Sequence, residues 1–308
     1  MNSDAIGLWG IPLAMLGGMI RASTPYLFVS LGETLTERSG RVNLGLEGTL
    51  LLGAVSAYGV AFHSGSPWLG VLAAFGCGLG FGALHAILCA RPRVNHIAVG
   101  IALMLFGTGL AFYLGKPLVQ PQAPNLPALG LGDFSDQPAV REALRVNPLF
   151  LVGVALAPAL AWALRSTRLG LILRLTGESE DAALALGYNV LRVRLLATML
   201  GGGLSGVGGA FLSLYYPGIW SEGLSSGQGL IAVSLVIFAR WNPNHCLYAS
   251  LIYGAAGSLG SALQSAGIAV SHHLLAATPA ALTLLIMLIT CSPDRPAQGV
   301  PRELSLGL

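Results

Sequence analysis

The sequence predicts an all-α membrane protein, a single polytopic bundle of about nine transmembrane helices that occupies residues 1–308. Three features of the composition predict this fold class: 54% of the residues are hydrophobic, only 9% are charged, and 42 are glycine. Ordinary soluble domains carry charge on about a quarter of their residues. Helices in lipid gain little from hydrophobicity and use small residues to approach one another, so the glycines fit the same prediction.

The expected crossings are apolar segments near the length that spans a bilayer, about 20 residues, with some allowance for tilted or buried helices. A shorter apolar stretch, residues 6–20, either lengthens the first crossing on its outer side or lies against the membrane surface. The nine segments are residues 22–36, 43–62, 68–90, 95–114, 147–164, 193–214, 224–239, 246–268 and 273–291.

The arginines predict the orientation, because short cytoplasmic loops collect Lys and Arg while translocated loops do not. We therefore expect a multi-pass protein of the bacterial inner membrane, with its amino terminus outside and its carboxyl terminus in the cytoplasm. In this orientation the inner ends hold Arg38, Arg41, Arg91, Arg93, Arg165, Arg168, Arg174, Arg192, Arg194, Arg240, Arg295 and Arg302, and the outer ends hold Arg21, Lys116, Arg141 and Arg145.

The same orientation makes residues 116–146 an extracytoplasmic loop. Its PLVQPQAPNLPAL run is rich in proline, which favours an extended or irregular cap over a helix.

Glycines four residues apart within the crossings predict close helix packing. These pairs are Gly76 and Gly80, Gly78 and Gly82, and Gly202 and Gly206.

Between the first two crossings, ETLTERSGRVNLGLEG interrupts the apolar pattern with acidic and basic residues. A charge at the centre of a lipid-exposed helix costs about 2.5 to 3.5 kcal/mol on insertion scales, so such groups face a partner or a watery cavity. One interpretation is a broken helix that lines a substrate path, with Asn43 and Glu47 as candidates. The other is an ordinary cytoplasmic turn in which Glu37 and Arg38 are solvated. The sequence leaves both open.

A second polar segment, YYPGIWSEGLSSGQG at residues 215–229, precedes the seventh crossing. It predicts a gate or a re-entrant piece, with Glu222 and Gln228 as further candidates for lining the path. Aromatic residues also gather at the membrane interface. We expect an interfacial belt from Tyr215, Tyr216 and Trp220.

Residues 177–190 form an acidic, alanine-rich stretch between two arginine clusters, and we interpret the surrounding residues 166–192 as a cytoplasmic coupling loop. Residues 179–186 suit a short helix, since acids in its first turn complement the helix dipole. Gly177 is expected to break the chain before this helix and Gly187 to cap its end. The candidates for contact with a partner are Gly177, Glu178, Ala182, Ala183, Gly187 and Asn189.

The phosphate-loop motif of ATPases, G-x-x-x-x-G-K-[ST], is missing from the sequence. The four cysteines stand apart, without the spacing of metal ligands, so no metal site is expected. The charge of +3 is a signal of topology rather than of nucleic-acid binding. If such a chain moves a solute through the membrane, its energy must come from an ion gradient or from a separate ATPase.

Three stretches carry a family resemblance: TPYLFVSLGETLTERSGRVNLGLEGTLLLGA, GESEDAALALGYNVLRVRLLATMLGGGLSGVGGAFLSL, and WSEGLSSGQGLIAVSLVIFARWNPNHCLYASLIYGAAGSL. They resemble the permease subunits of nucleoside and simple-sugar ABC importers, in the group that includes ribose and branched-chain amino acid permeases. The resemblance covers most of residues 24–290, and ERSGRVNLGLEG points to the nucleoside-type branch. The first helix of ribose-type permeases has no counterpart here.

This resemblance implies a type II ABC importer-like permease rather than an enzyme. Its partners would be a second permease subunit in a homo- or heterodimer, ATP-binding subunits that hold ATP and Mg²⁺, and an extracytoplasmic binding protein. The chain itself would need no cofactor. Two alternatives stay open: a stand-alone secondary transporter driven by a gradient, and an ABC permease for branched-chain amino acids.

Overall fold

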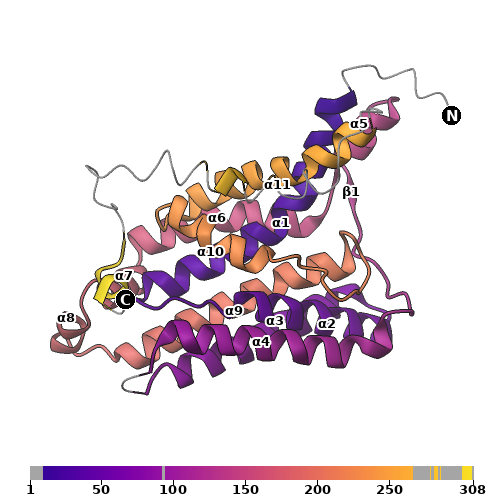
Figure 1. The fold of residues 1–308 in the computed structure, drawn as a ribbon. Coiled ribbons are helices and arrows are strands. Elements are labelled where there is room, and N and C mark those ends of the chain that lie inside the picture. Colours follow the sequence, from indigo (N-terminus) through magenta and orange to yellow (C-terminus); the bar gives the residue numbers. More distant parts are fainter. Residues whose placement is uncertain are drawn as a thin grey trace.

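The computed structural model describes residues 10–91, 94–265, 278, 281–283, 285 and 300–306. The chain is mainly helical, and its long helices run side by side (Figure 1). These helices are α1 (Gly10–Arg38), α2 (Leu46–Ser64), α3 (Pro67–Leu88), α4 (His96–Gly115), α6 (Pro148–Ser166), α9 (Val190–Leu214), α10 (Gln228–Phe238) and α11 (Pro243–Ser265).

Four helices in the described part of the chain are long and apolar enough to cross a membrane. They are α3, α6, α9, and α4 together with the 3-10 turn η3 (Lys116–Leu118) that extends it. The helical fold class is thus confirmed, whereas the count of nine crossings stays a prediction. The ninth expected segment, residues 273–291, lies almost wholly outside the described residues.

Helix α1 answers the question left open by the apolar stretch at residues 6–20. It runs without a break from Gly10 to Arg38, through Arg21 and Pro25, so the described part of that stretch continues the helix of the first expected crossing. The helix ends where Gly40 adopts φ +88°, a conformation that favours glycine.

Helix α9 lies at the centre of the bundle. Of its membrane-length window 72% is buried, compared with 22% for α4. Glycines let neighbouring backbones approach α9 closely: a Cβ at Gly78 of α3 would lie 2.8 Å from the Gly202 carbonyl carbon. The faces of Gly78 and Gly82 pack on α9 as expected, whereas Gly76 and Gly80 face open space, so only one of the two predicted faces of α3 is used.

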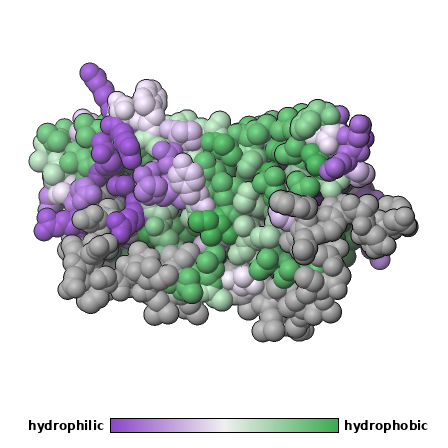
Figure 2. Space-filling view, turned by 90° about the horizontal axis from the view of Figure 1, so that it is seen from above, coloured by the Kyte–Doolittle hydropathy of each residue, from purple (hydrophilic) through white to green (hydrophobic). Residues whose placement is uncertain are grey.

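The outer face of α4 is apolar and exposed, with Leu105 at 66% and Tyr113 at 73% of their full accessible surface. Soluble monomers rarely expose contiguous apolar surface of this kind, so the face is suited to lipid. Figure 2 shows hydrophobic residues across the middle of the molecule and hydrophilic residues gathered toward its ends.

The proline-rich loop, residues 116–146, is partly ordered by regular structure that the sequence did not predict. It contains α5 (Pro138–Ala143) and a two-stranded antiparallel sheet of β1 (Leu129–Gly130) and β2 (Arg145–Val146). The strands also depart from the all-α prediction. Residues 122–128 are irregular, as expected.

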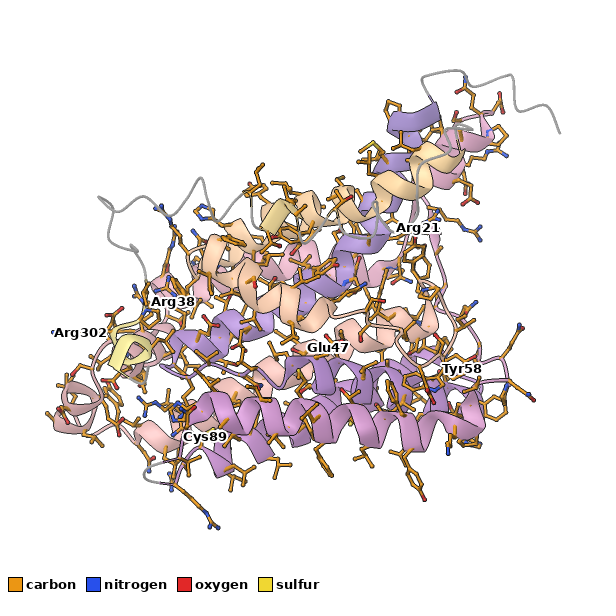
Figure 3. All side chains as sticks on the ribbon, viewed as in Figure 1. Arg21, Arg38, Glu47, Tyr58, Cys89 and Arg302 are labelled. Carbon is orange, nitrogen blue, oxygen red and sulfur yellow. The ribbon has the colours of Figure 1, made fainter. Side chains whose placement is uncertain are left out.

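The outer loop is tied to the helical bundle by hydrogen bonds and an ion pair. The Tyr58 hydroxyl of α2 donates to the Pro121 carbonyl at 2.8 Å. On the other side Arg21 of α1 pairs with Glu142 of α5 at 3.1 Å. Figure 3 shows Arg21 at this end of the molecule and Arg38 and Arg302 at the opposite end.

Candidate functional site

The insert between α6 and α9 folds into two short helices, α7 (Arg168–Glu178) and α8 (Glu180–Ala185). Side chains cap the start of each helix: Thr167 Oγ1 accepts the Gly170 N–H at 3.1 Å at the start of α7, and Ser179 Oγ accepts the Ala182 N–H at 3.2 Å at the start of α8. The following helix, α9, is capped by Asn189 Oδ1, which accepts the Arg192 N–H at 3.0 Å. Such caps satisfy backbone donors that a helix leaves free. Gly187, with φ +82°, follows α8 and ends it as the sequence predicts.

The structure corrects two roles assigned to this insert. Gly177 lies within the last turn of α7, and the chain breaks at Ser179, which is extended with φ −158°. Ala183 is completely buried, so it packs inward rather than toward a partner, and Ala182 is half-buried. The other candidates are exposed, namely Glu178, Gly187 and Asn189.

Exposed apolar side chains at the end of α8 escaped the sequence analysis. Leu184 is 54% exposed and Leu186 is 67% exposed, and Tyr188 is exposed beside them. The sequence signal that could have revealed them is the presence of large apolar residues within a polar insert. We call the surface formed by these three residues, Leu184, Leu186 and Tyr188, the α8 tip.

Buried Arg194 of α9 joins α8 to the rest of the molecule. Its Nη1 donates to Glu180 Oε2 at 2.7 Å, and its Nε donates to the Ser39 carbonyl at 3.1 Å. Its Nη2 lies 3.7 Å from Glu303 Oε2 of α14 (Arg302–Leu306). Glu303 Oε1 in turn accepts the Glu180 N–H at 3.0 Å. One guanidinium thus connects α8, α9, α14 and the turn after α1.

Close backbone contact joins α7 to the end of α1. A Cβ at Gly177 would meet the Arg38 carbonyl oxygen and would lie 3.2 Å from the Gly40 nitrogen. A Cβ at Gly40 would lie 3.3 Å from Arg194 Nη2. The absence of a side chain at Gly177 and Gly40 therefore allows the two backbones to touch. A movement of α7 would displace the end of α1.

The turn between α1 and α2 is held by buried polar groups rather than by solvent. The Asn43 N–H donates to Glu33 Oε1 at 2.7 Å, and Asn43 Oδ1 accepts the Gly45 N–H at 2.9 Å. Glu37 is buried and accepts a hydrogen bond from Trp241 Nε1. The interpretation of Glu37 as a solvated residue is therefore wrong.

Arg41 of the same turn is also buried, and its Nη1 donates to the Ala86 carbonyl at 3.2 Å. Burial lowers the pKa of Arg41, because the charged form loses hydration, and the nearby guanidinium of Arg194 lowers it further.

Glu47 binds the start of α10. Its carboxylate accepts hydrogen bonds from the Ser225 hydroxyl, from the Gly227 N–H at 3.1 Å and from the Gly229 N–H at 2.7 Å. Helix amino termini favour negative charge because their N–H groups are unpaired. Figure 3 shows Glu47 between the two ends of the molecule, so the broken-helix interpretation fits its position.

Of the other residues predicted to line the path, Gln228 lies beside Glu47, because it stands between Gly227 and Gly229, whose N–H groups bind the Glu47 carboxylate. Glu222 is exposed, whereas Gln228 is half-buried and begins α10. The Gln228 Oε1 atom is buried and lacks a hydrogen-bond partner among the described residues. Trp220 is only 2% exposed, so it is a core residue, and its assignment to an interfacial belt is wrong.

Family comparison identifies the chain. The model of the family described as "Branched-chain amino acid transport system / permease component" matches residues 15–291.

Metal-binding clusters of three or more His, Cys, Asp or Glu side chains are absent from the residues that the structure describes.

Three relatives are similar over most of their length. The "Putative glucose ABC transporter permease protein TsgC13" of Haloferax volcanii is 34% identical, covering 84% of this chain and 80% of its own. The "Nucleoside ABC transporter permease protein NupC" of Lactococcus lactis subsp. cremoris is 35% identical, covering 80% and 81%. The "Guanosine ABC transporter permease protein NupQ" of Bacillus subtilis is 30% identical, covering 77% and 78%.

These matches confirm the resemblance carried by the three sequence stretches. They also agree with the apolar helices of membrane length in the structure. The chain therefore belongs to the family of permease components of branched-chain amino acid-type transport systems, and it is a multi-pass membrane protein.

Proposed function

We propose that this chain is the permease subunit of an ATP-driven ABC importer that carries nucleosides or simple sugars. The observation that carries the proposal is the family match over residues 15–291. The names of the relatives supply the substrate class, since those at 30–35% identity are described as nucleoside, guanosine or glucose permeases.

The energy would come from separate ATP-binding subunits that dock on the α8 tip and hold the ATP and Mg²⁺. Leu184 on the short helix α8 and Leu186 just after it offer exposed apolar side chains, and apolar helix faces dock into apolar grooves of their partners. Glu178 and Asn189 are exposed on either side of α8 and would form the rim of this contact.

Movement of α8 would reach the spans through the contacts of Arg194 and Gly177. Arg194 is a buried residue of the central helix α9, and Gly177 lies against the backbone at the end of α1. Packed helices move as rigid bodies and switch between discrete arrangements. Closure of the ATP-binding subunits would therefore rotate α9 and α1 together.

The substrate path would pass the amino terminus of α10. Gln228 presents a buried Oε1 atom without a partner among the described residues, which suits the hydroxyl or N–H donors of a sugar or nucleobase. Glu47 and Asn43 would act indirectly, because their polar atoms hold the backbone around the path. Exposed Glu222 would lie at the entrance.

In this assembly α8 and the carboxyl-terminal α14 face the cytoplasm, and the loop at residues 116–146 faces an extracytoplasmic binding protein. Two permease subunits, identical or different, would form the pore. The shared end of Arg38 and Arg302 (Figure 3) and the excess of arginine there support this orientation.

The test is uptake by proteoliposomes that contain the permease, its cognate ATP-binding subunits and its binding protein. We expect uptake of radiolabelled nucleoside or glucose that requires ATP hydrolysis. Uptake of the same size by vesicles that lack the ATP-binding subunits would instead support the gradient-driven secondary transporter.

A second candidate substrate class is the branched-chain amino acids, which the description of the family names. Ligand binding to the cognate binding protein separates the two classes. Selection of a nucleoside or sugar over leucine is expected, and tight selection of leucine would overturn the substrate assignment while leaving the permease assignment intact.

A further inference from the structure

A cationic cavity of about 200 Å³ lies where the ends of α1, α6 and α7 meet the turn between α10 and α11. Four arginines line it, one from each of these elements, and His245 lies beside them. No carboxylate is among its described lining residues. The four arginines are Arg38, Arg165, Arg174 and Arg240.

The charges of this cavity are poorly compensated within the part of the chain that the structure describes. None of the four arginines makes an ion pair there. Arg174 and Arg165 both repel Arg38, and Glu178 is the carboxylate that acts against this repulsion. Arg38 Nε is bound to the Trp241 carbonyl at 3.0 Å.

Arg174 provides a second, independent sign of a missing ligand. Its Nε atom is buried and has no hydrogen-bond partner among the described residues. A buried donor without a partner costs about 1–3 kcal/mol in general. An anion in the cavity would accept from this atom and would also relieve the repulsion among the guanidinium groups.

The shape and position of the cavity indicate the kind of anion. Guanidinium groups bind phosphate with two parallel hydrogen bonds. The volume is smaller than the roughly 300–1,000 Å³ of drug-sized pockets, so it suits a single phosphate group. Leu164, Ala161 and Pro243 add apolar wall to the same cavity, and the cavity lies at the end of the long helices, where lipid headgroups lie.

We propose that this cavity binds the phosphate of an anionic phospholipid, such as phosphatidylglycerol, from the cytoplasmic leaflet. Basic pockets between transmembrane helices on that side of the membrane bind anionic headgroups. The bound lipid would bridge α1, α6, α7 and the α10–α11 turn. The assignment to this leaflet rests on the proposed orientation, whereas the binding itself does not depend on ATP or substrate.

The test uses the full-length permease in nanodiscs of phosphatidylcholine with a small fraction of labelled phosphatidylglycerol. Arg174→Gln is expected to weaken retention of the labelled lipid on the order of tenfold, as for loss of a charge-assisted hydrogen bond. Arg168→Gln, an exposed arginine on the same helix and outside the cavity, should leave retention unchanged. Equal loss in both variants would show only general attraction to basic surface and would overturn the proposal.

Arg165→Gln is a second variant that separates loss of lipid binding from a folding defect. Because Arg165 is exposed, its substitution should lower lipid retention without disturbing the fold.

Inorganic phosphate is the competing source of the same chemistry. Lipid retention that persists in millimolar phosphate supports the headgroup. Displacement of the lipid by phosphate at equal concentration would assign the cavity to a free anion and would contradict the proposal. A failure of ATP-driven uptake would leave this assay unaffected.

Discussion

Arg194 Nη1 and Glu180 Oε2 lie 2.7 Å apart and join the central helix α9 to α8. Glu180 is 44% exposed on its side chain, whereas that of Arg194 is only 8% exposed. Loss of the pair therefore leaves the more costly unpaired group on α9. The same guanidinium holds the Ser39 carbonyl, so the end of α1 depends on it as well.

Substitution of Arg194 should uncouple α8 from the spans. We expect Arg194→Gln to lower stability by about 1–2 kcal/mol, after allowance for the exposure of Glu180, and to reduce ATP-driven uptake more than tenfold. Thermal unfolding of the purified permease and uptake by proteoliposomes measure the two effects. Exposed Arg192→Gln is the control and should change neither by much. Strict additivity with Glu180→Gln would contradict a direct coupling of the pair.

Buried Ala183 and exposed Leu186 should respond in opposite ways. Ala183→Leu overpacks a completely buried site and should destabilise the permease by about 1–3 kcal/mol. Leu186→Asp should leave thermal stability unchanged while lowering co-purification of the ATP-binding subunits on the order of tenfold or more, because Leu186 is 67% exposed. Equal co-purification with Leu186→Asp and with the unaltered chain would rule out the α8 tip as the docking surface.

Neutralising Glu47 should disturb the start of α10. Glu47→Gln replaces an acceptor with an N–H₂ group that faces existing donors, so we expect a loss of about 1–3 kcal/mol together with reduced uptake. Thermal unfolding provides the measurement, with exposed Glu222→Gln from the nearby segment as its control. An unchanged unfolding temperature in Glu47→Gln would show that the carboxylate does not hold this helix.

The two glycine faces of α3 form a matched pair for mutation. Gly78→Ala would press on the backbone of α9 at Gly202 and should cost about 1–3 kcal/mol. Gly80→Ala faces open space and should be neutral or slightly stabilising, since alanine restricts the unfolded chain. Unfolding temperatures of the two variants should differ by several degrees, and equal values would mean that α3 and α9 are less closely packed than described.

Local sequence signals predicted much of this fold. The hydrophobic segments gave the positions of the long helices, and Gly187 gave the end of α8, because these features depend on the chain nearby. The break at Ser179 was misplaced by two residues, since Gly177 is required for contact with the distant Arg38 backbone rather than for a turn. Spatial partners of that kind leave no local pattern.

The site could be predicted only in part for the same reason. Glu47 was found because an acid within an apolar run is unusual, but its partners Ser225 and Gly229 come from about 180 residues later in the chain. Burial also reversed two interpretations, since Ala183 and Trp220 face the interior. The direction of a side chain follows from packing between helices, which composition does not specify.

Site-specific photo-crosslinking in the assembled transporter tests the central claim most directly. A crosslinker at Leu186 should give an adduct with an ATP-binding subunit, while one at Tyr113, which is at least as exposed and lies on the apolar face of α4, should give none. Absence of the adduct at Leu186, or labelling of Leu186 by a reagent confined to the outside of the cell, would contradict the account.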